Sequence, residues 1–499
     1  MPIPVVDLFA GPGGLNEGFS RVTDTRGRPV FRTVISVEMD EFAHRTLELR
    51  ALYRAMKQDG DFADYLTYVR GELTREELFA RASALGADAQ AEALRATMGA
   101  SRSGDDEIES RIDSALKNSG GGEFVLIGGP PCQAYSLVGR ARRSRESRDQ
   151  FESDPRQRLY LEYLRIVARF KPAAFLMENV PGLLSAKLEG QSTFAMIRKD
   201  LTAAGYDLYA LNKGDSLFET DTPDPRAFVV RAEDHGVPQS RSRVFILGLR
   251  RDLGLKARRL QPAADTRVFV EEVLRGLPAI RSRVSRRADS PEEWRREVSS
   301  LGDYKFPGLD EGMRRLIRAG VAELDSDLPL GRQFIRGEIK PPRLGEWYDS
   351  RAVGGVLNHN SRGHMAADLR RYYYWSAYAG VHHRSPSLSE VPAHLRPNHH
   401  NVTGDATNLP FADRFRVQIA GRPSTTITSH IAKDGHYYIH FDPQQCRSLS
   451  VREAARLQTF PDTYFFEGPI TEQYRQVGNA VPPYLARQIG DLVASILHA

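Results

Sequence analysis

A short apolar stretch near the N-terminus runs directly into a glycine-rich turn. The letters "IPVVDLFAGPGG" are typical of a strand and a tight turn, and "LNEGFSRV" continues with the helical spacing of Leu15, Phe19 and Val22. A second apolar stretch, "FRTVISVEMD", brings acidic Glu38 to about the distance from the turn expected in a nucleotide-binding βαβ unit. This beginning constrains the chain to an α/β fold with an open parallel sheet.

Two later apolar stretches, "FVLIGG" and "AAFLMENV", are predicted to be further buried strands. Both end in polar residues, and the carboxyl edge of an open parallel sheet is where such folds bind ligands. Glu178 and Asn179 lie at one such end, while Arg241 and Arg243 in "VPQSRSRVFILG" alternate on one face of the strand that follows. These residues are either ordinary ion pairs or charges gathered at a site.

The stretch "VLIGGPPCQAYS" holds Cys132, one of only two cysteines. An isolated cysteine is more often buried and inert, but Pro130 and Pro131 stiffen the chain and disfavour a regular buried element. A thiol just past a strand end can be exposed, and nearby positive charge stabilises its thiolate. A cysteine, an acid and arginines at neighbouring strand ends are suited to attack on a heterocycle.

Length and composition narrow the class of protein. A chain of 499 residues exceeds what one core usually organises, so we expect two or more domains. With 41% hydrophobic residues and two cysteines, the chain reads as a soluble protein of a reducing compartment, and a disulfide scaffold is excluded. Neither a secretion signal nor a membrane span is evident, so we expect a cytoplasmic protein. The arginine-rich run "GRARRSRESR" and a net charge of +5 suggest a polyanionic partner.

The pattern along the chain predicts the domain organisation. We expect a first domain over residues 1–248, interrupted by a polar helical insertion at about 50–122 that carries no identifiable chemistry. Residues 249–445 lose periodicity and contain aromatic clusters such as "RRYYYWSAY", which predicts a second domain with long loops. Residues 446–499 return to order, with a helix in "LSVREAARLQTF" and a turn before an amphipathic helix in "YRQVGNAVPPYLARQIGDLVASIL".

Seven blocks of sequence together resemble one family, the cytosine-C5 DNA methyltransferases of bacterial or phage type. In chain order they are "DLFAGPGG", "VEMD", "GGPPCQAYS", "MENVPG", "QSRSRVFILG", "LSVREAARLQTFPD" and "QVGNAVPP". The resemblance implies a Rossmann-like domain dependent on S-adenosylmethionine and a smaller, irregular target-recognition domain. It also implies double-stranded DNA as substrate, a monomer that needs no metal, and a place in a restriction-modification or related defence system beside a separate endonuclease.

The resemblance also implies a mechanism. Cys132 adds to C6 of a cytosine that has been flipped out of the duplex, which makes C5 nucleophilic toward the methyl group. Glu178 holds or protonates N3, Arg243 binds O2, and Arg241 supports the same pocket.

The family positions for the cofactor map onto individual residues. Phe9 and Met39 correspond to adenine contacts, and Glu38 corresponds to the ribose ligand. The methionine end is lined by Gly11, Gly13, Gly14, Pro131 and Asn479, together with Ala480, where some relatives place serine. Asp61 and Asp113 both remain candidates for the contact to the adenine amino group.

The DNA contacts implied by the resemblance lie in two segments. They are Gln133, Ser136, Arg140, Arg142 and Arg143 in a lid, and Thr426 and Thr428 near the end of the recognition domain. His359 and His364 fit no standard zinc spacing, so DNA contact or loop packing is preferred. Two alternatives stay open: a transfer RNA cytosine methyltransferase, and a DNA-binding relative without catalysis.

Overall fold

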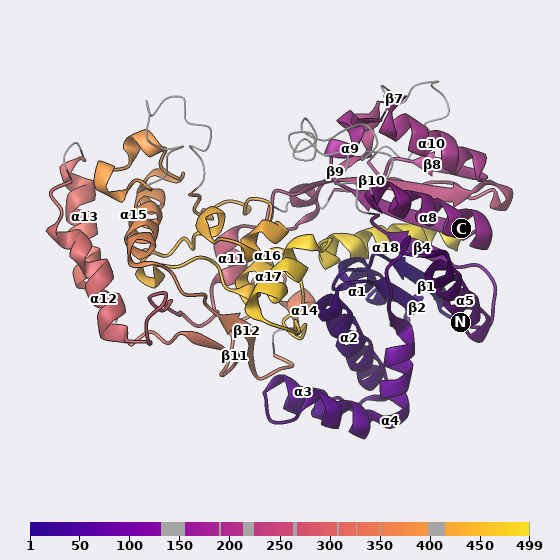
Figure 1. Cartoon of the computed structure of the whole chain (residues 1–499), viewed down its shortest axis with the longest axis horizontal. Coiled ribbons are helices and arrows are strands. Elements are labelled where there is room, and N and C mark those ends of the chain that lie inside the picture. The colour runs from indigo at the N-terminus through magenta and orange to yellow at the C-terminus, as the bar shows by residue number, and fades with distance from the viewer. Residues whose placement is uncertain are drawn as a thin grey trace.

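The computed structural model has an elongated shape with a β-sheet domain at one end and a helical lobe at the other (Figure 1). The residues that the structure describes are 1–130, 155–188, 191–212, 224–262, 267–306, 309–325, 327–349, 351–397 and 415–498. Both chain termini lie at the end that carries the sheet, and this end is called the sheet domain below.

One mixed sheet organises the sheet domain. Its strands, in spatial order, are β3 (Ala93–Arg95), β2 (Phe31–Glu38), β1 (Ile3–Leu8), β4 (Val125–Gly128), β5 (Ala174–Asn179), β10 (Ser242–Arg250) and β8 (Tyr206–Tyr209), and β9 (Val229–Arg231) also pairs with β10. The strands from β3 to β5 are mutually parallel, whereas β10 is antiparallel to β5, β8 and β9. The predicted α/β class and Rossmann-like sheet are therefore confirmed.

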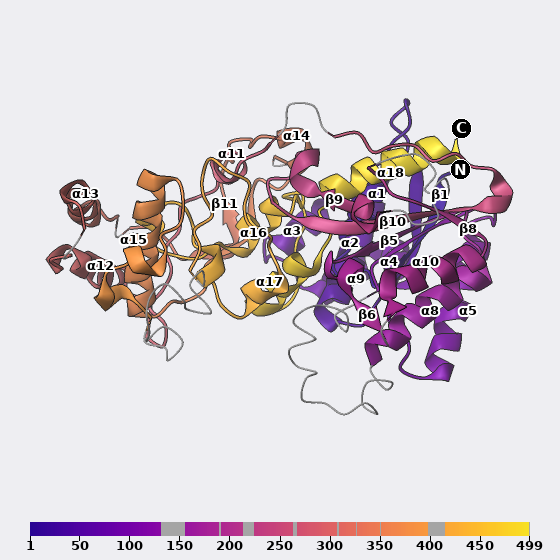
Figure 2. The same ribbon diagram turned by 90° about the horizontal axis from the view of Figure 1, so that it is seen from above.

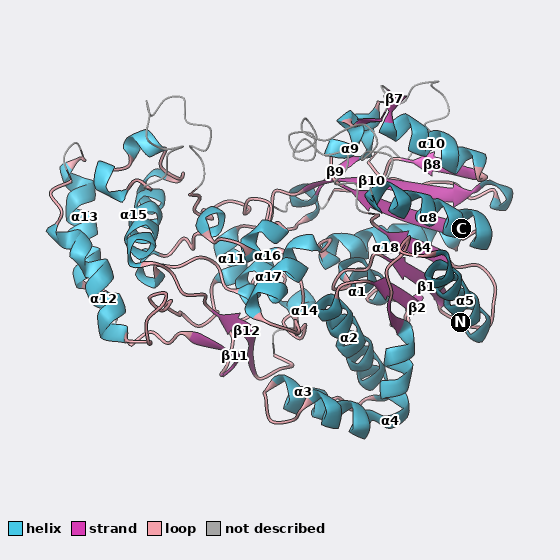
Figure 3. Cartoon of the chain, in the orientation of Figure 1, coloured by secondary structure: helices cyan, strands magenta, loops and turns pink. Residues whose placement is uncertain are grey.

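Helices cover both faces of the sheet, as Figures 2 and 3 show. One face packs on α1 (Gly14–Ser20) and α18 (Pro483–Leu497), and the other on α5 (Arg102–Asn118), α8 (Pro155–Phe170) and α10 (Thr193–Ala203). Successive residues of one strand point to opposite faces, so Val5 joins the first core and Val6 the second. This double burial explains why the strands read as continuous apolar runs.

The expected helical insertion turns out to be two different structures. Its later part belongs to the sheet, because residues 93–95 form edge strand β3, which pairs with β2, and α5 packs against the sheet. The prediction of an all-helical stretch was wrong here, since a strand of three residues is too short to show periodicity. Its earlier part projects away as α2 (Glu41–Asp59), α3 (Ala63–Val69) and α4 (Arg75–Glu92) (Figure 1).

The described residues between 267 and 445 form the distal lobe, which is more regular than its sequence indicated. Trp294 of α12, Ile317 of α13 and Trp375 of α15 share a core, so the cluster "RRYYYWSAY" packs inside a helical lobe. Its helices and strands are α11 (Val270–Leu274), α12 (Pro291–Ser299), α13 (Glu311–Ala322), β11 (Gly331–Arg336), α14 (Gly345–Tyr348), β12 (Gly355–Asn360) and α15 (Ala366–His382).

The C-terminal segment returns from the distal lobe to the sheet domain. Helix α16 (Val451–Leu457) lies where a helix was predicted. In the last motif, however, the helix α17 (Ile470–Asn479) comes before the turn, which occupies the residues ahead of α18.

The remaining short α-helix and strands are α9 (Gly182–Ser185), β6 (Lys187–Leu188) and β7 (Gln191–Ser192). Among the described residues, every helix is too short or too polar to span a bilayer.

Close packing between β5 and β10 gives a first testable prediction. Gly248 pairs with Phe175, and a Cβ atom at Gly248 would lie 2.1 Å from the Phe175 ring. Because overpacking a closed core forces neighbours out of place, Gly248→Ala should lower the free energy of unfolding by about 1–3 kcal/mol. Urea denaturation measures this effect.

Gly380→Ala is the matched control, because a Cβ there meets no atom of the described residues within 4 Å. This change lies within α15 and should leave stability unchanged or raise it by up to about 1 kcal/mol, since alanine favours helices over glycine. Equal effects of the two substitutions would contradict the packing argument.

Candidate active site

A cavity of about 430 Å³ lies at the carboxyl ends of the parallel strands. Residues after β1, β2, β3, β4 and β5 line one side, and residues at the start of β10 and around α17 line the other. The lining residues at the strand ends include Phe9, Glu38, Thr97, Gly129 and Glu178. The predicted ligand edge of the sheet therefore carries a hollow built from distant parts of the chain.

Glu38 organises the glycine-rich turn. Its carboxylate accepts hydrogen bonds from the backbone N–H groups of Gly11 at 2.7 Å and Asp40 at 2.8 Å. Burial raises the pKa of this carboxyl. A Cβ on Gly14 would lie 2.2 Å from the carbonyl oxygen of Val481, so glycine lets the C-terminal segment approach the turn.

Two apolar side chains border the same cavity. Phe9 has a φ of 56°, a left-handed conformation that costs a residue other than glycine about 1–3 kcal/mol. The Met39 side chain lines the cavity with 59% of its surface exposed. The aromatic ring of Phe9 and the exposed side chain of Met39 together offer apolar surface to a flat ligand.

Asp7 lies beside these groups and was not singled out by the sequence. It is 1% exposed, and neither carboxylate oxygen has a hydrogen-bond partner among the described residues. Burial, and then the negative charge of Glu38, raise its pKa well above the usual range. The sequence does contain a signal for this site, because an acidic residue lies inside the apolar run "VVDLF" just before the turn. Such a carboxylate is costly to bury alone and would be stabilised by a positively charged ligand.

Glu178 and Arg243 form the charged pair of the site. Arg243 Nε lies 2.9 Å from Glu178 Oε1, and both side chains are largely buried. Desolvation lowers the pKa of Arg243. Next to this pair, Asn179 Nδ2 donates to the carbonyl oxygen of Pro130 at 2.9 Å, which fixes the strand end that leads toward Cys132.

Several predicted site residues lie outside the described residues. They are Pro131, Cys132, Gln133, Ser136, Arg140, Arg142 and Arg143. Pro130, two residues before Cys132 in the sequence, lines the described cavity.

Arg241 also lines the cavity, but its guanidinium is held by backbone. Nη1 donates to the carbonyl oxygen of Ile427 at 2.7 Å and Nη2 to that of Ala480 at 2.8 Å. Burial, followed by the charge of Arg243, lowers its pKa well below the usual value. Arg241 therefore ties the distal lobe and the C-terminal segment to β10.

Other predicted residues divide between the cavity and its surroundings. Asn479, Ala480 and Thr428 line the cavity, and the Thr428 hydroxyl lies 2.9 Å from Tyr438 Oη. Thr426, which is absent from the described lining, donates its hydroxyl hydrogen to the carbonyl oxygen of Ser240 at 2.6 Å.

The two acidic candidates for an adenine contact both lie elsewhere. Asp61 accepts a hydrogen bond from the N–H of Ala63, and Asp113 pairs with Lys117, so neither belongs to the described lining. Residues 96–98, which follow β3, do line the cavity. These residues escaped notice because β3 itself was not recognised.

The histidines are engaged in packing. His359 Nδ1 lies 2.8 Å from Ser450 Oγ, and Nε2 lies 2.8 Å from the carbonyl oxygen of Pro278. Burial lowers the pKa of His359 to about 4. Within the described ranges, no group of three or more His, Cys, Asp or Glu residues is arranged to hold a metal ion.

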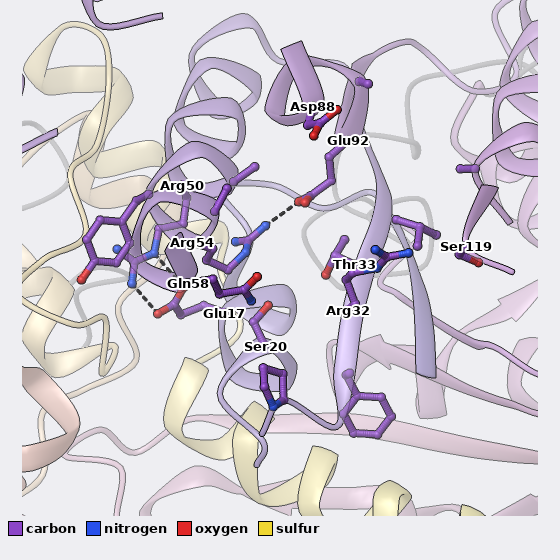
Figure 4. A pocket seen from close by; sticks show the side chains of 18 of the residues that line it. Glu17, Ser20, Arg32, Thr33, Arg50, Arg54, Gln58, Asp88, Glu92 and Ser119 are labelled. Carbon is purple, nitrogen blue, oxygen red and sulfur yellow. Dashed lines mark hydrogen bonds and ion pairs between the residues drawn. The ribbon is translucent and has the colours of Figure 1, made fainter. Parts of the chain in front are cut away.

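A second cavity, of about 880 Å³, lies between β2 and helices α2, α4 and α5 (Figure 4). Two of its acids are paired: Glu17 with Arg50, and Glu92 with Arg54. The smaller cavity instead contains the unpaired Asp7, so we take the smaller one as the candidate active site.

The unpaired Asp7 gives a prediction about stability and pH. Asp7→Asn should raise the free energy of unfolding at pH 8 by about 1–3 kcal/mol, because it removes a buried acidic group that has no partner among the described residues. The folded-state pKa is raised, so stability of the unmodified protein falls as pH rises from the ordinary value of 3.8 through the raised one. The advantage of the variant should therefore shrink toward pH 4.

Urea denaturation at several pH values measures this difference. Asp113→Asn is the control, since Asp113 is 43% exposed and pairs with Lys117 on the surface of α5. A destabilised Asp7→Asn protein at pH 8 would show that the carboxylate has a stabilising partner in solution.

Comparison with known proteins identifies the family of this chain. The family described as C-5 cytosine-specific DNA methylase matches residues 112–494. The type II methyltransferase M.Bpa9945I of Bacillus paralicheniformis is 32% identical, with 99% of each chain covered. M.AgeI of Thalassovita gelatinovora, also a type II methyltransferase, is 30% identical over 74% of this chain and 82% of its own.

A solved structure shares the fold. It is an Escherichia coli prophage protein assigned to the DNA modification methyltransferases, with a TM-score of 0.53, 21% identity and full coverage of both chains. The family match covers more than half of the sequence, and the Bacillus relative spans nearly all of it. The chain therefore belongs to the C-5 cytosine-specific DNA methylases and is a DNA (cytosine-5-)-methyltransferase.

Proposed function

We propose that the cavity at the sheet edge binds S-adenosylmethionine and opens toward a target cytosine. The unpaired carboxylate of Asp7 carries this proposal, because S-adenosylmethionine has a sulfonium and an ammonium group, and a buried lone acid favours a cationic ligand. Phe9 and Met39 supply apolar surface for adenine. Glu38 keeps lone pairs that a ribose diol can use beside the two backbone bonds.

The methionine end of the ligand lies against the glycine turn and the α17 terminus. Gly11, Gly14, Asn479 and Ala480 line this part of the cavity, and Gly13 caps α1. The residues after β3, with the Thr97 hydroxyl, face the same hollow where an acidic contact was expected. When bound, S-adenosylmethionine supplies the methyl group.

The protein's own residues perform the activation of cytosine. The Cys132 thiolate forms a bond to C6, and the electron pair displaced from the C5–C6 double bond makes C5 nucleophilic. Glu178 holds N3 and Arg243 binds O2, so that charge entering the ring is neutralised. After C5 has accepted the methyl group, loss of the C5 proton and of the thiolate restores the aromatic ring. The 2.9 Å pair of Glu178 and Arg243 supports these roles, because each group orients the other.

Double-stranded DNA is the proposed partner. A stacked cytosine is out of reach of a thiol, so the target base leaves the helix and enters the cavity. The distal lobe reads the sequence, with Thr428 at its junction to the site and the arginines of "GRARRSRESR" on phosphates. The names of the relatives support a modification role in a restriction-modification system, and we expect the enzyme to act as a monomer.

The proposed nucleophile can be tested by covalent trapping. A duplex with 5-fluorocytosine at the target should form a stable adduct, because fluorine cannot leave C5 as a cation. Cys132→Ala should abolish the adduct and methylation while cofactor affinity stays nearly unchanged. Denaturing electrophoresis detects the adduct, and bisulfite sequencing of DNA from expressing cells identifies the methylated sequence.

Cys446→Ala is the matched control, because it removes the only other cysteine, which is buried and has a pKa raised by burial. This variant should still be trapped. An adduct that persists in Cys132→Ala would assign the nucleophile to another residue, and trapping of transfer RNA in place of duplex DNA would favour the alternative substrate.

The cofactor site can be tested at Glu38. Glu38→Ala should weaken S-adenosylmethionine binding by about 1.5–3 kcal/mol, the range for hydrogen bonds to a charged group. Because burial raises the pKa of Glu38, binding to the unmodified protein should weaken as the pH falls through that raised value. Calorimetry at several pH values measures both effects.

Glu41→Ala is the control for this change. Glu41 follows closely in the sequence, but its half-exposed side chain lies 3.6 Å from Arg95 and is absent from the described lining of the cavity. Equal losses of affinity in both variants, or none in Glu38→Ala, would remove Glu38 from the ligand site.

A further inference from the structure

We infer that helices α2, α3 and α4, residues 41–92, form a strut that sets the position of the distal lobe on the sheet domain and so determines how tightly the enzyme binds duplex DNA. This inference rests on the proposed function of the distal lobe in DNA binding. The strut leaves the sheet domain after β2 and reaches the hairpin of β11 and β12 (Figures 1 and 2). Most of it falls within residues 50–122, the insertion in which the sequence showed no chemistry.

The root of the strut is an ion pair buried against the sheet. Arg50 of α2 donates to Glu17 of α1 through Nε at 2.8 Å and Nη2 at 2.6 Å, and Arg54 pairs with Glu92 (Figure 4). Burial alone would raise the pKa of Glu17, but Arg50 and then Arg21 lower it to about 2. A buried pair with two hydrogen bonds fixes the direction in which α2 leaves the sheet.

The middle of the strut is bound to the C-terminal segment. Tyr65 Oη donates to the carbonyl oxygen of Thr463 at 2.5 Å, and Arg50 Nη1 donates to the same oxygen at 3.2 Å. Glu467, which is buried, accepts from Tyr68 Oη at 2.6 Å and from Arg75 Nη1 at 3.1 Å. Residues 463–467 are thereby held between the strut and the rest of the protein.

The tip of the strut shares a hydrophobic core with the distal lobe. Buried Tyr65, Val69 and Leu78 of the strut pack in one cluster with buried Val353 and Leu357 of the hairpin region. Such a joint core resists separation because apolar area on both sides would return to water. The strut and the hairpin therefore behave as one packed unit.

Polar contacts fix the register of this joint. Arg70 Nη2 donates to the carbonyl oxygen of Val353 at 2.9 Å, and its guanidinium lies 5.8 Å from the centroid of the Phe334 ring. Arg336 of β11 pairs with Glu72 at 3.3 Å. Contacts to both the hairpin strand and the loop before β12 specify one orientation of the lobe.

The hairpin is in turn hydrogen-bonded to the C-terminal segment. Asn358 of β12 exchanges hydrogen bonds with the backbone of Phe466, its Nδ2 donating at 3.2 Å and its Oδ1 accepting at 2.9 Å. The chain then continues into α15 and the distal core. The cofactor cavity is bordered at its edge by Asp40 and Ala43, whereas no residue of α3 or α4 occurs in its described lining. A loosened tip should thus affect DNA binding and leave cofactor binding intact.

The test is a double substitution at the joint between the strut and the distal lobe, Arg70→Ala with Phe334→Ala. These are called the tip variants below. We expect the dissociation constant for a duplex containing the target sequence to rise about 3- to 30-fold, the range in which long-range positioning contacts act. Affinity for S-adenosylmethionine should not change, and kcat at saturating DNA should be retained. Arg70→Ala alone replaces the double variant if the latter does not fold.

Arg81→Ala is the matched control, because Arg81 belongs to α4 and pairs with Asp64 within the strut, with 56% of its side chain exposed. It should leave both affinities unchanged. Unchanged DNA affinity in the tip variants, or an equal loss of cofactor affinity, would overturn the inference.

Small-angle X-ray scattering separates this inference from the proposed function. The tip variants should show a broader distribution of interatomic distances than the unmodified protein and Arg81→Ala, because the lobe is less firmly held. If the unmodified protein binds no duplex DNA, the proposed function fails, and scattering alone decides whether the strut holds the lobe. An unchanged distribution of interatomic distances in the tip variants would contradict the inference that the strut holds the distal lobe.

Discussion

The guanidinium of Arg241 is the point at which three distant parts of the chain meet. It extends from the residue just before β10 to the carbonyl oxygens of Ile427 in the distal lobe and Ala480 after α17. Gln239 strengthens the same junction, since its Oε1 accepts from the N–H of Ile427 and its Nε2 donates to Gln458 Oε1. The cavity has walls from all three parts, so its shape depends on these bonds. A buried cation bonded to carbonyl oxygens is costly to leave unsatisfied, which keeps the three parts together.

Two buried acids near the sheet, Glu17 and Asp7, differ in whether they have a hydrogen-bond partner. Glu17 is fully matched by Arg50, and that pair anchors a helix. Asp7 has no matching donor among the described residues, and Phe9, two residues later, holds a strained backbone. Glu17 is thus satisfied within the protein, whereas Asp7 keeps unused hydrogen-bonding capacity for a ligand. This contrast identifies the smaller cavity better than size does.

Sequence reasoning succeeded where a long apolar strand ends in a chemically distinct residue. Glu38 and Glu178 lie at the ends of β2 and β5 and border the cavity, as their places at predicted strand ends indicated. It missed β3, because three strand residues within an Ala- and Glu-rich stretch carry no periodic signal. The role of Arg241 was also out of reach, since spacing places it beside Arg243 but cannot show that remote carbonyl groups hold it.

The helices between β2 and β3 show how a segment without chemistry can still serve a site. Composition assigned residues 50–122 to a polar insertion, and the surface of α4 fits that description. The few apolar side chains of this segment determine where it packs, because Val69 and Leu78 are buried partly against Val353 and Leu357 of the distal lobe. A polar segment of this kind cannot complete a core by itself, and it completes one by bridging the sheet domain and the distal lobe. The position of the recognition surface is thereby tied to hydrophobic burial remote from the reacting atoms.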